Sequence, residues 1–153
     1  MTKAVESRFD SSRLDWRSYQ LGVIAAFSEV VSLGCKRLAL SSPMTEEQFN
    51  EIIDEATLIA RDHGLTLYVD DDFLETRLFN PEHTRGKRVI HIASERATID
   101  KYEALREEKR RRAEEGTLTD KAETEIAQGL GRLLSYSDEA IEKLLSRHHK
   151  GRT

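Results

Sequence analysis

Apolar side chains recur at helical spacing through most of this chain and form short strand-like runs in three places. One helical pattern ends at Gly34 and another runs from Thr45 to Gly64, while the short runs cover residues 36–41, 65–69 and 89–93. A period of about 3.6 residues indicates an amphipathic helix, and a short apolar run between turn signals indicates a strand. This alternation predicts an α/β or α+β protein.

The first helix is expected to start near Ser12, because Asp15 follows three residues later and the two resemble a capping box. Its apolar positions predict the face that is buried against the core. They are Trp16, Tyr19, Val23, Phe27, Val30 and Val31. This helix is expected to end at Gly34.

The second helix has the clearest start signal in the chain. Thr45 with Gln48 three residues later forms a capping box, and Met44 is placed to contact Phe49 across the cap. A strand precedes this helix and another follows it. The three elements predict a βαβ unit, whose two strands run parallel.

Residues 89–93 predict a central strand, because they are apolar on both faces except at His91. Its direction relative to the other strands is left open. Ser94 is expected to cap a third helix, in which Ile99, Tyr102 and Leu105 form a short apolar stripe. Since this stripe stops halfway along, the second half either projects from the core or meets another chain.

Two further helices after Gly116 predict a helical hairpin. The expected organisation is an α/β domain over residues 1–115, a hairpin over residues 116–148 packed on that domain or on a partner subunit, and a polar tail over residues 149–153. The predicted fold is thus a small three-stranded sheet with a βαβ unit, covered by helices, plus this hairpin. Gly129 and Gly131 weaken the first hairpin helix, which fits either a closely packed neighbouring helix or an early helix end.

Charge and composition narrow the class of protein. The chain has 28 acidic and 24 basic side chains and a formal net charge of −4, which argues against a protein that mainly binds a polyanion. A nucleic-acid role for the basic run from Lys109 to Arg112 is therefore the weakest reading, since glutamates flank the run. The longest apolar stretch, Gly22 to Phe27, is far below the roughly 20 residues of a membrane span. A single cysteine without an apolar leader predicts a cytoplasmic protein.

Three consecutive aspartates at the end of the second strand, Asp70 to Asp72, are the most distinctive group of candidate site residues. Alternate residues of a strand point to opposite sides, so Asp70 and Asp72 are expected to share a site that Asp71 does not enter. Carboxylates at this spacing suit a divalent cation such as Mg²⁺ or Mn²⁺, with Ser41 or Ser42 as further ligands.

Other candidate site residues lie at the same strand ends. Thr45 begins a helix whose free backbone amides attract phosphate or another small anion. His91 and His83 are the candidates for proton transfer, and the alternative for His91 is a buried, hydrogen-bonded structural role. If the third strand is parallel, Ser94 joins this edge of the sheet. If it is antiparallel, basic residues come near the aspartates instead, namely Arg85, Lys87 and Arg88.

Two main hypotheses for function follow. The first is a small intracellular binding or interaction protein, a homo-oligomer or an accessory subunit, because the helices carry more apolar surface than a three-stranded sheet can cover. The second is a small metal-dependent or phosphate-substrate enzyme, with Asp70 and Asp72 near Ser41 and Ser42.

Overall fold

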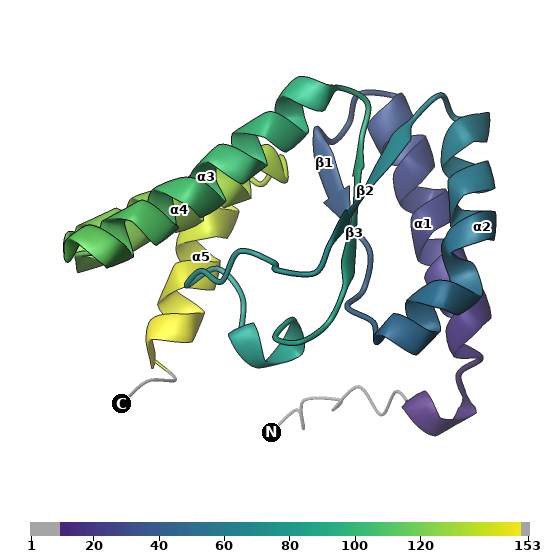
Figure 1. Cartoon of the computed structure of the whole chain (residues 1–153), viewed down its shortest axis with the longest axis horizontal. Coiled ribbons are helices and arrows are strands. Elements are labelled where there is room, and N and C mark those ends of the chain that lie inside the picture. Colours follow the sequence, from purple (N-terminus) through teal and green to yellow (C-terminus); the bar gives the residue numbers. More distant parts are fainter. Residues whose placement is uncertain (1–9, 151–153) are drawn as a thin grey trace, which may run out of the picture.

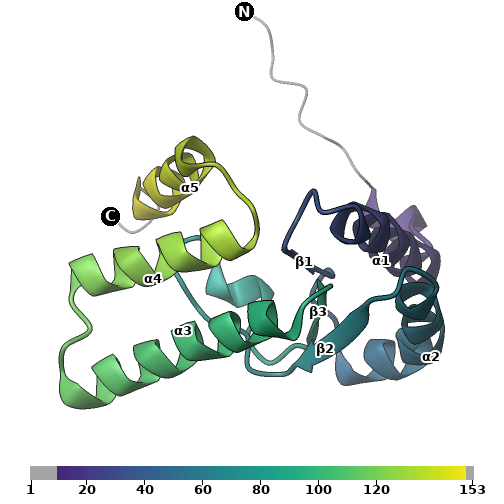
Figure 2. The same ribbon diagram turned by 90° about the horizontal axis from the view of Figure 1, so that it is seen from above.

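The chain folds into three layers, with a small sheet between two groups of helices (Figure 1). The computed structural model describes residues 10–150. One group of helices contains α1 (Trp16–Ser32) and α2 (Glu46–Asp62), and the other contains α3 (Arg96–Glu115), α4 (Asp120–Leu133) and α5 (Asp138–Lys150). Seen from above, the two groups lie on opposite sides of the sheet (Figure 2).

The sheet has three strands in the order β1, β3, β2. They are β1 (Leu38–Leu40), β2 (Thr66–Asp70) and β3 (Val89–Ala93), and β3 runs antiparallel to both neighbours. The predicted three-stranded sheet is confirmed as part of a small α+β fold. The strands joined by α2 run parallel, as predicted, but β3 lies between them. All five β3 residues are buried, so this strand takes the central place.

The two faces of β3 belong to two separate apolar cores. Ile90 and Ile92 face the core beneath α1 and α2. Val89 and Ala93 face the core beneath α3, α4 and α5, and His91 between them points the same way. Every helix therefore has access to one core or the other, which is why a sheet this small holds five helices.

Local signals placed the start of α2 correctly. The Gln48 amide donates to Thr45 Oγ1 at 3.2 Å and the Thr45 amide donates to Gln48 Oε1 at 3.0 Å, which confirms the predicted capping box. Met44 and Phe49 lie in the same core. This helix is fixed at its start by residues close together in the sequence.

The predicted starts of α1 and α3 were wrong. Ser12 lies in a short 3-10 turn, and α1 begins at Trp16 with Asp15 as a cap whose carboxylate accepts from the Ser18 hydroxyl at 2.6 Å rather than from a backbone amide. At α3 the residue before the helix is Glu95, without a capping side-chain bond, and Ser94 precedes it. Both helices are placed by packing rather than by a cap.

The second half of α3 does not project freely, because α4 lies along it (Figure 2). A Cβ on Gly129 would lie 3.0 Å from Leu105 of α3, and a Cβ on Gly131 would lie 2.6 Å from Ile141 of α5. Close packing by neighbouring helices therefore explains both glycines. Residues of the hairpin, Ile126 and Ile141 among them, share one core with the sheet.

Two parts of the predicted organisation lie outside the described residues, namely residues 1–9 of the α/β domain and residues 151–153 of the polar tail. Helix α5 ends at Lys150, so residues 149 and 150, predicted to be in the polar tail, are helical. Among residues 10–150, none of the helices has the length and apolar character to cross a bilayer.

Candidate functional site

Four side chains meet at the end of β2 and form a polar cluster, the Asp70 network, which is buried except at Arg106. Asp70 comes from β2, His91 from β3, and Tyr102 and Arg106 from α3. The side chains of Asp70 and His91 are 0% exposed. Because α3 brings Tyr102 and Arg106 to the same face four residues apart, this cluster joins the helix to both strands.

Both carboxylate oxygens of Asp70 are fully engaged. Oδ2 accepts from Tyr102 Oη and lies 2.9 Å from His91 Nε2. Oδ1 accepts from Arg106 Nη1 and from the Asp72 amide, each at 2.9 Å. A carboxylate that already accepts this many hydrogen bonds has no free oxygen directed at an outside ligand.

Aromatic rings enclose His91. The centroids of Tyr102, Tyr68 and Phe73 lie 4.3, 5.4 and 5.9 Å from that of the imidazole. Within the described part of the chain, Nδ1 is buried and has no hydrogen-bond partner. A histidine beside an aspartate is the pairing used in general acid–base catalysis, but here the remaining nitrogen faces rings rather than a substrate cleft. The alternative reading of His91, a buried histidine hydrogen-bonded within the fold, describes this geometry.

Electrostatics keep Asp70 ionised. Burial alone would raise the pKa of its carboxyl group, but hydrogen bonds from His91, Tyr102 and the Asp72 amide outweigh burial and lower that pKa below its usual value of 3.8. Burial and the adjacent carboxylate raise the pKa of Tyr102, so its hydroxyl stays protonated and donates. The network is thus an ionised carboxylate held by donors.

Stability is expected to fall in acid through this carboxylate. A lowered native pKa stabilises the fold above the unfolded value, near 3.9, and this stabilisation is lost as the pH falls through the native pKa. Urea unfolding between pH 7 and pH 3 should show a steeper loss for the natural chain than for Asp70→Asn. Asp71→Asn, at the exposed neighbour, should keep the steeper loss. Identical pH dependence in Asp70→Asn and the natural chain would contradict this assignment.

Ser41 and Ser42 lie at the end of β1, but their polar groups hold the fold together. Ser41 Oγ accepts from the Ile90 amide at 2.9 Å and donates to the Ser42 carbonyl at 3.0 Å. The fully buried Gln20 amide donates to the Ser42 carbonyl at 2.8 Å and accepts from the Ser42 amide at 3.1 Å. Gln20 therefore makes the pair of bonds that a neighbouring strand would make.

The divalent cation predicted at Asp70 and Asp72 stays a prediction, and the geometry counts against it. Asp72 is exposed and contributes its backbone to the Asp70 network. No three His, Cys, Asp or Glu side chains within residues 10–150 are grouped so that they could hold a metal ion. The cation that reaches Asp70 is Arg106, whereas Arg85 and Arg88 pair with Glu75 and Glu46.

The other predicted site residues are dispersed. Thr45 caps α2, whose first turn carries Glu46 and Glu47, and these carboxylates oppose an anion at that helix end. His83 is exposed on the 3-10 turn Pro81–His83. The structure therefore brings together Asp70 and His91, and it adds Tyr102 and Arg106, which the sequence did not indicate as site residues.

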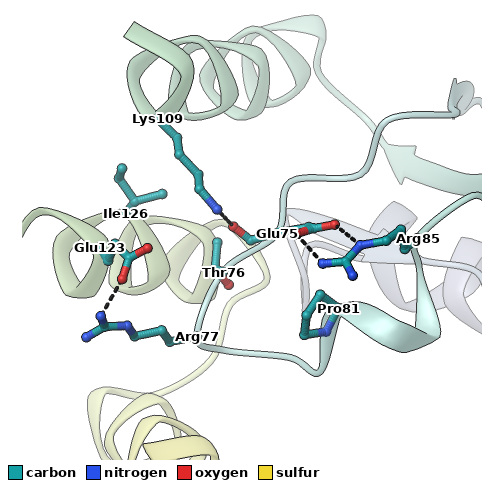
Figure 3. Close-up of a pocket in the computed structure, with 8 residues that line it drawn as sticks. All are labelled: Glu75, Thr76, Arg77, Pro81, Arg85, Lys109, Glu123 and Ile126. Carbon is teal, nitrogen blue, oxygen red and sulfur yellow. Dashed lines mark hydrogen bonds and ion pairs between the residues drawn. The ribbon is translucent and has the colours of Figure 1, made fainter. Parts of the chain in front are cut away.

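A pocket of about 190 Å³ lies between the segment after β2 and helices α3 and α4 (Figure 3). Its charged side chains are already paired with protein groups. Arg77 pairs with Glu123, Arg85 pairs with Glu75, and Lys109 donates to the Glu75 carbonyl. An anionic ligand would have to replace one of these carboxylates. The pocket residues instead connect the segment to the helices through ion pairs and hydrogen bonds.

The basic run is paired along α3 in the same way. Arg110 pairs with Glu107 and Glu114, and Arg112 pairs with Glu108 at 3.1 Å. The glutamates on the same helix neutralise the positive charge that would attract a nucleic-acid backbone.

The largest departure from the predicted packing is on α1. Its buried residues are Gln20, Ile24, Ser28 and Val31, so only Val31 of the predicted apolar stripe is buried. The expectation that this stripe faces the core holds only in part: Val31 lies in the core and Trp16 and Phe27 pack against it, whereas two polar residues take the most buried positions. The Gln20 amide is used at Ser42, whereas Ser28 Oγ is buried without a partner in the described chain.

The outward side of α1 instead carries apolar residues at a seven-residue repeat, here called the α1 seam. Its members are Trp16, Tyr19, Val23, Ala26, Val30 and Leu33. Tyr19, Ala26 and Leu33 are exposed, Tyr19 and Leu33 to 42% and 71%. Trp16, Val23 and Val30 are half-buried, and Trp16 also packs against the core beneath α1 and α2. Alternating steps of three and four place them on one side of the helix, the spacing with which a helix packs against another helix.

Nothing in the described chain covers the α1 seam with a further helix. Figure 2 shows the sheet on one side of α1 and helix α2 on another side. This agrees with the contacts that α1 makes to α2, β1 and β3. The helix has the charged residues Arg17 and Glu29, and Arg17 pairs with Glu55 of α2. A helix that is apolar on an uncovered side is typical of an interaction surface.

Comparison with known proteins found no relative: no family model, no curated protein and no solved structure matches this chain.

Proposed function

We propose that this protein is an interaction protein that binds a helix of another protein chain along the α1 seam. The observation that carries the proposal is that α1 places an uncharged seven-residue repeat outward while it buries Gln20 and Ser28 inward. A partner helix packed there removes exposed aromatic and aliphatic surface from water, which favours association.

The geometry of α1 supports a helix as the bound element. Its 17 residues extend about 25 Å, and apolar residues spaced every 3.5 residues keep two helices in contact along such a length. The Asp70 network supports the same proposal indirectly, since its carboxylate and imidazole are enclosed and its groups are hydrogen-bonded within the fold.

The single tryptophan gives a direct test, because Trp16 lies at the start of the seam and is half-buried, so a bound helix can shield it further. The probe is a synthetic amphipathic helix with leucine at the first and fourth positions of three heptads and Glu–Lys pairs elsewhere. Titration into the protein should shift Trp16 emission to shorter wavelength and saturate. Val23→Glu should weaken binding about tenfold or more, because a seam position then carries a charge that docking must bury.

Leu58→Glu is the matched control, since Leu58 is 55% exposed on α2 and lies outside the seam. This variant should bind the peptide like the natural chain. Equal loss of binding in both variants, or no emission shift at any peptide concentration, would remove the basis of the proposal.

A further inference from the structure

We infer that the helix bound at the α1 seam is α1 of a second copy of this chain, packed antiparallel about a two-fold axis between Val23 and Ala26. This inference rests on the proposed function and names its partner. A two-fold contact uses the same surface on both copies, so that surface must be its own complement.

The residue sizes along the seam fit this condition. In the antiparallel arrangement Trp16 faces Leu33 of the second copy, Tyr19 faces Val30, and Val23 faces Ala26. Each layer then combines a larger side chain with a smaller one, so the layers are more even in size than they would be in a parallel pair. A parallel pair would place Trp16 against Trp16 and Ala26 against Ala26, so some layers would be crowded and another left empty.

Charge favours the same arrangement. The seam has no charged member, so two copies meet there without burying like charges. Antiparallel helices place the positive end of one helix dipole beside the negative end of the other. The exposed carboxylate of Asp15 then lies at the end of the second helix that the exposed Arg37 follows, whereas the Lys36 amine lies over the rings of Phe27 and Tyr136 of its own chain.

A second copy also covers the α1 seams of both chains in one contact. A different protein would need a separate helix with the complementary order of large and small residues, whereas this chain already contains it. Because the contact is two-fold, association closes at a dimer and leaves no seam exposed.

Light scattering over a concentration series and a spin-label distance test the inference together. Cys35 is the chain's single cysteine and is exposed just beyond α1, so it can be labelled without a mutation. The scattering mass should rise to that of a dimer while Trp16 emission moves to shorter wavelength. In the antiparallel dimer the two labels should be about 30 Å apart along the helices, against about 10 Å in a parallel pair.

Two seam variants and one control separate docking from misfolding. Val23→Glu and Ala26→Glu should be monomeric, with circular dichroism unchanged. Ala26 is exposed in the single chain, so its replacement need not disturb the fold. Leu58→Glu should remain dimeric. A dimer that persists in both seam variants, or a label distance near 10 Å, overturns the inference.

A monomer at every concentration also overturns the inference of a dimer. The Trp16 emission then shows what covers the seam. If the monomer still binds the leucine peptide, the proposed function stands and the partner is another protein. If the Trp16 emission of the monomer moves to longer wavelength after residues 1–9 are deleted, that segment is the occupant. If the peptide fails as well, both proposals fail.

Discussion

Replacing Asp70 with alanine is expected to lower the free energy of unfolding by about 3 to 5 kcal/mol, the usual effect of removing one partner of a buried charge pair. The change leaves His91 Nε2 and the Tyr102 hydroxyl without their acceptor, and it removes the anion that Arg106 Nη1 contacts at 2.9 Å. Chemical denaturation at pH 7 measures the effect. Because β2, β3 and α3 are packed together and unfold as one unit, the unfolding transition of the variant should remain cooperative.

Asp71→Ala provides the control for this prediction. Asp71 is the neighbouring residue of the same chemical type, and it is exposed. Its replacement should change stability by no more than about 0.5 kcal/mol. A small loss in Asp70→Ala, comparable with that in Asp71→Ala, would show that the network does not stabilise the fold.

The second large effect is expected at Gly131, where alanine should destabilise the protein by about 1 to 3 kcal/mol even though alanine favours helices. The new Cβ would lie 2.6 Å from Ile141 Cγ1 and 2.8 Å from Cδ1. Ile141 is only 3% exposed, so its side chain has little room to move. Thermal or urea unfolding of Gly131→Ala measures the loss.

A neighbouring glycine and a double mutant test the cause. At Gly129 the nearest contact, 3.0 Å, is the terminal methyl of the half-buried Leu105, so Gly129→Ala should cost less than Gly131→Ala. Ile141→Ala should cost less in the Gly131→Ala background than alone, because it removes the clashing atoms. Additive effects of the two substitutions would rule out the clash as the cause.

Local signals in the sequence were sufficient for much of the fold. The capping box at Thr45 and the central position of β3 depend on residues close together in the chain, and both predictions are confirmed. The direction of β3 was left open, because an apolar run defines a strand but not its neighbours. Ser12 and Ser94 did not mark the starts of α1 and α3, since these helices start where packing places them.

The candidate site was harder to predict than the fold. Asp70 and His91 were both candidates, but their contact depends on β3 lying beside β2. Arg106 was not a candidate site residue, because 36 residues separate it from Asp70 and no local pattern connects them. The only hint was its position four residues after Tyr102, on the same face of a helix.

The α1 seam shows a further limit of sequence patterns. Apolar periodicity correctly predicted a helix and an apolar face, but a period does not say whether that face meets the chain's own core or another chain. The inward face was hidden by Gln20, a polar residue whose burial depends on its two bonds to Ser42.

The central place of β3 also imposes an order on folding. Both strand pairings in the sheet involve β3, because β1 and β2 each pair with β3 and not with each other. While a ribosome is still making the first 88 residues, β1 and β2 therefore have no partner strand. The sheet forms only after Val89–Ala93 has emerged. Until then α1 and α2 cannot complete their core, because Ile90 and Ile92 of β3 are part of it.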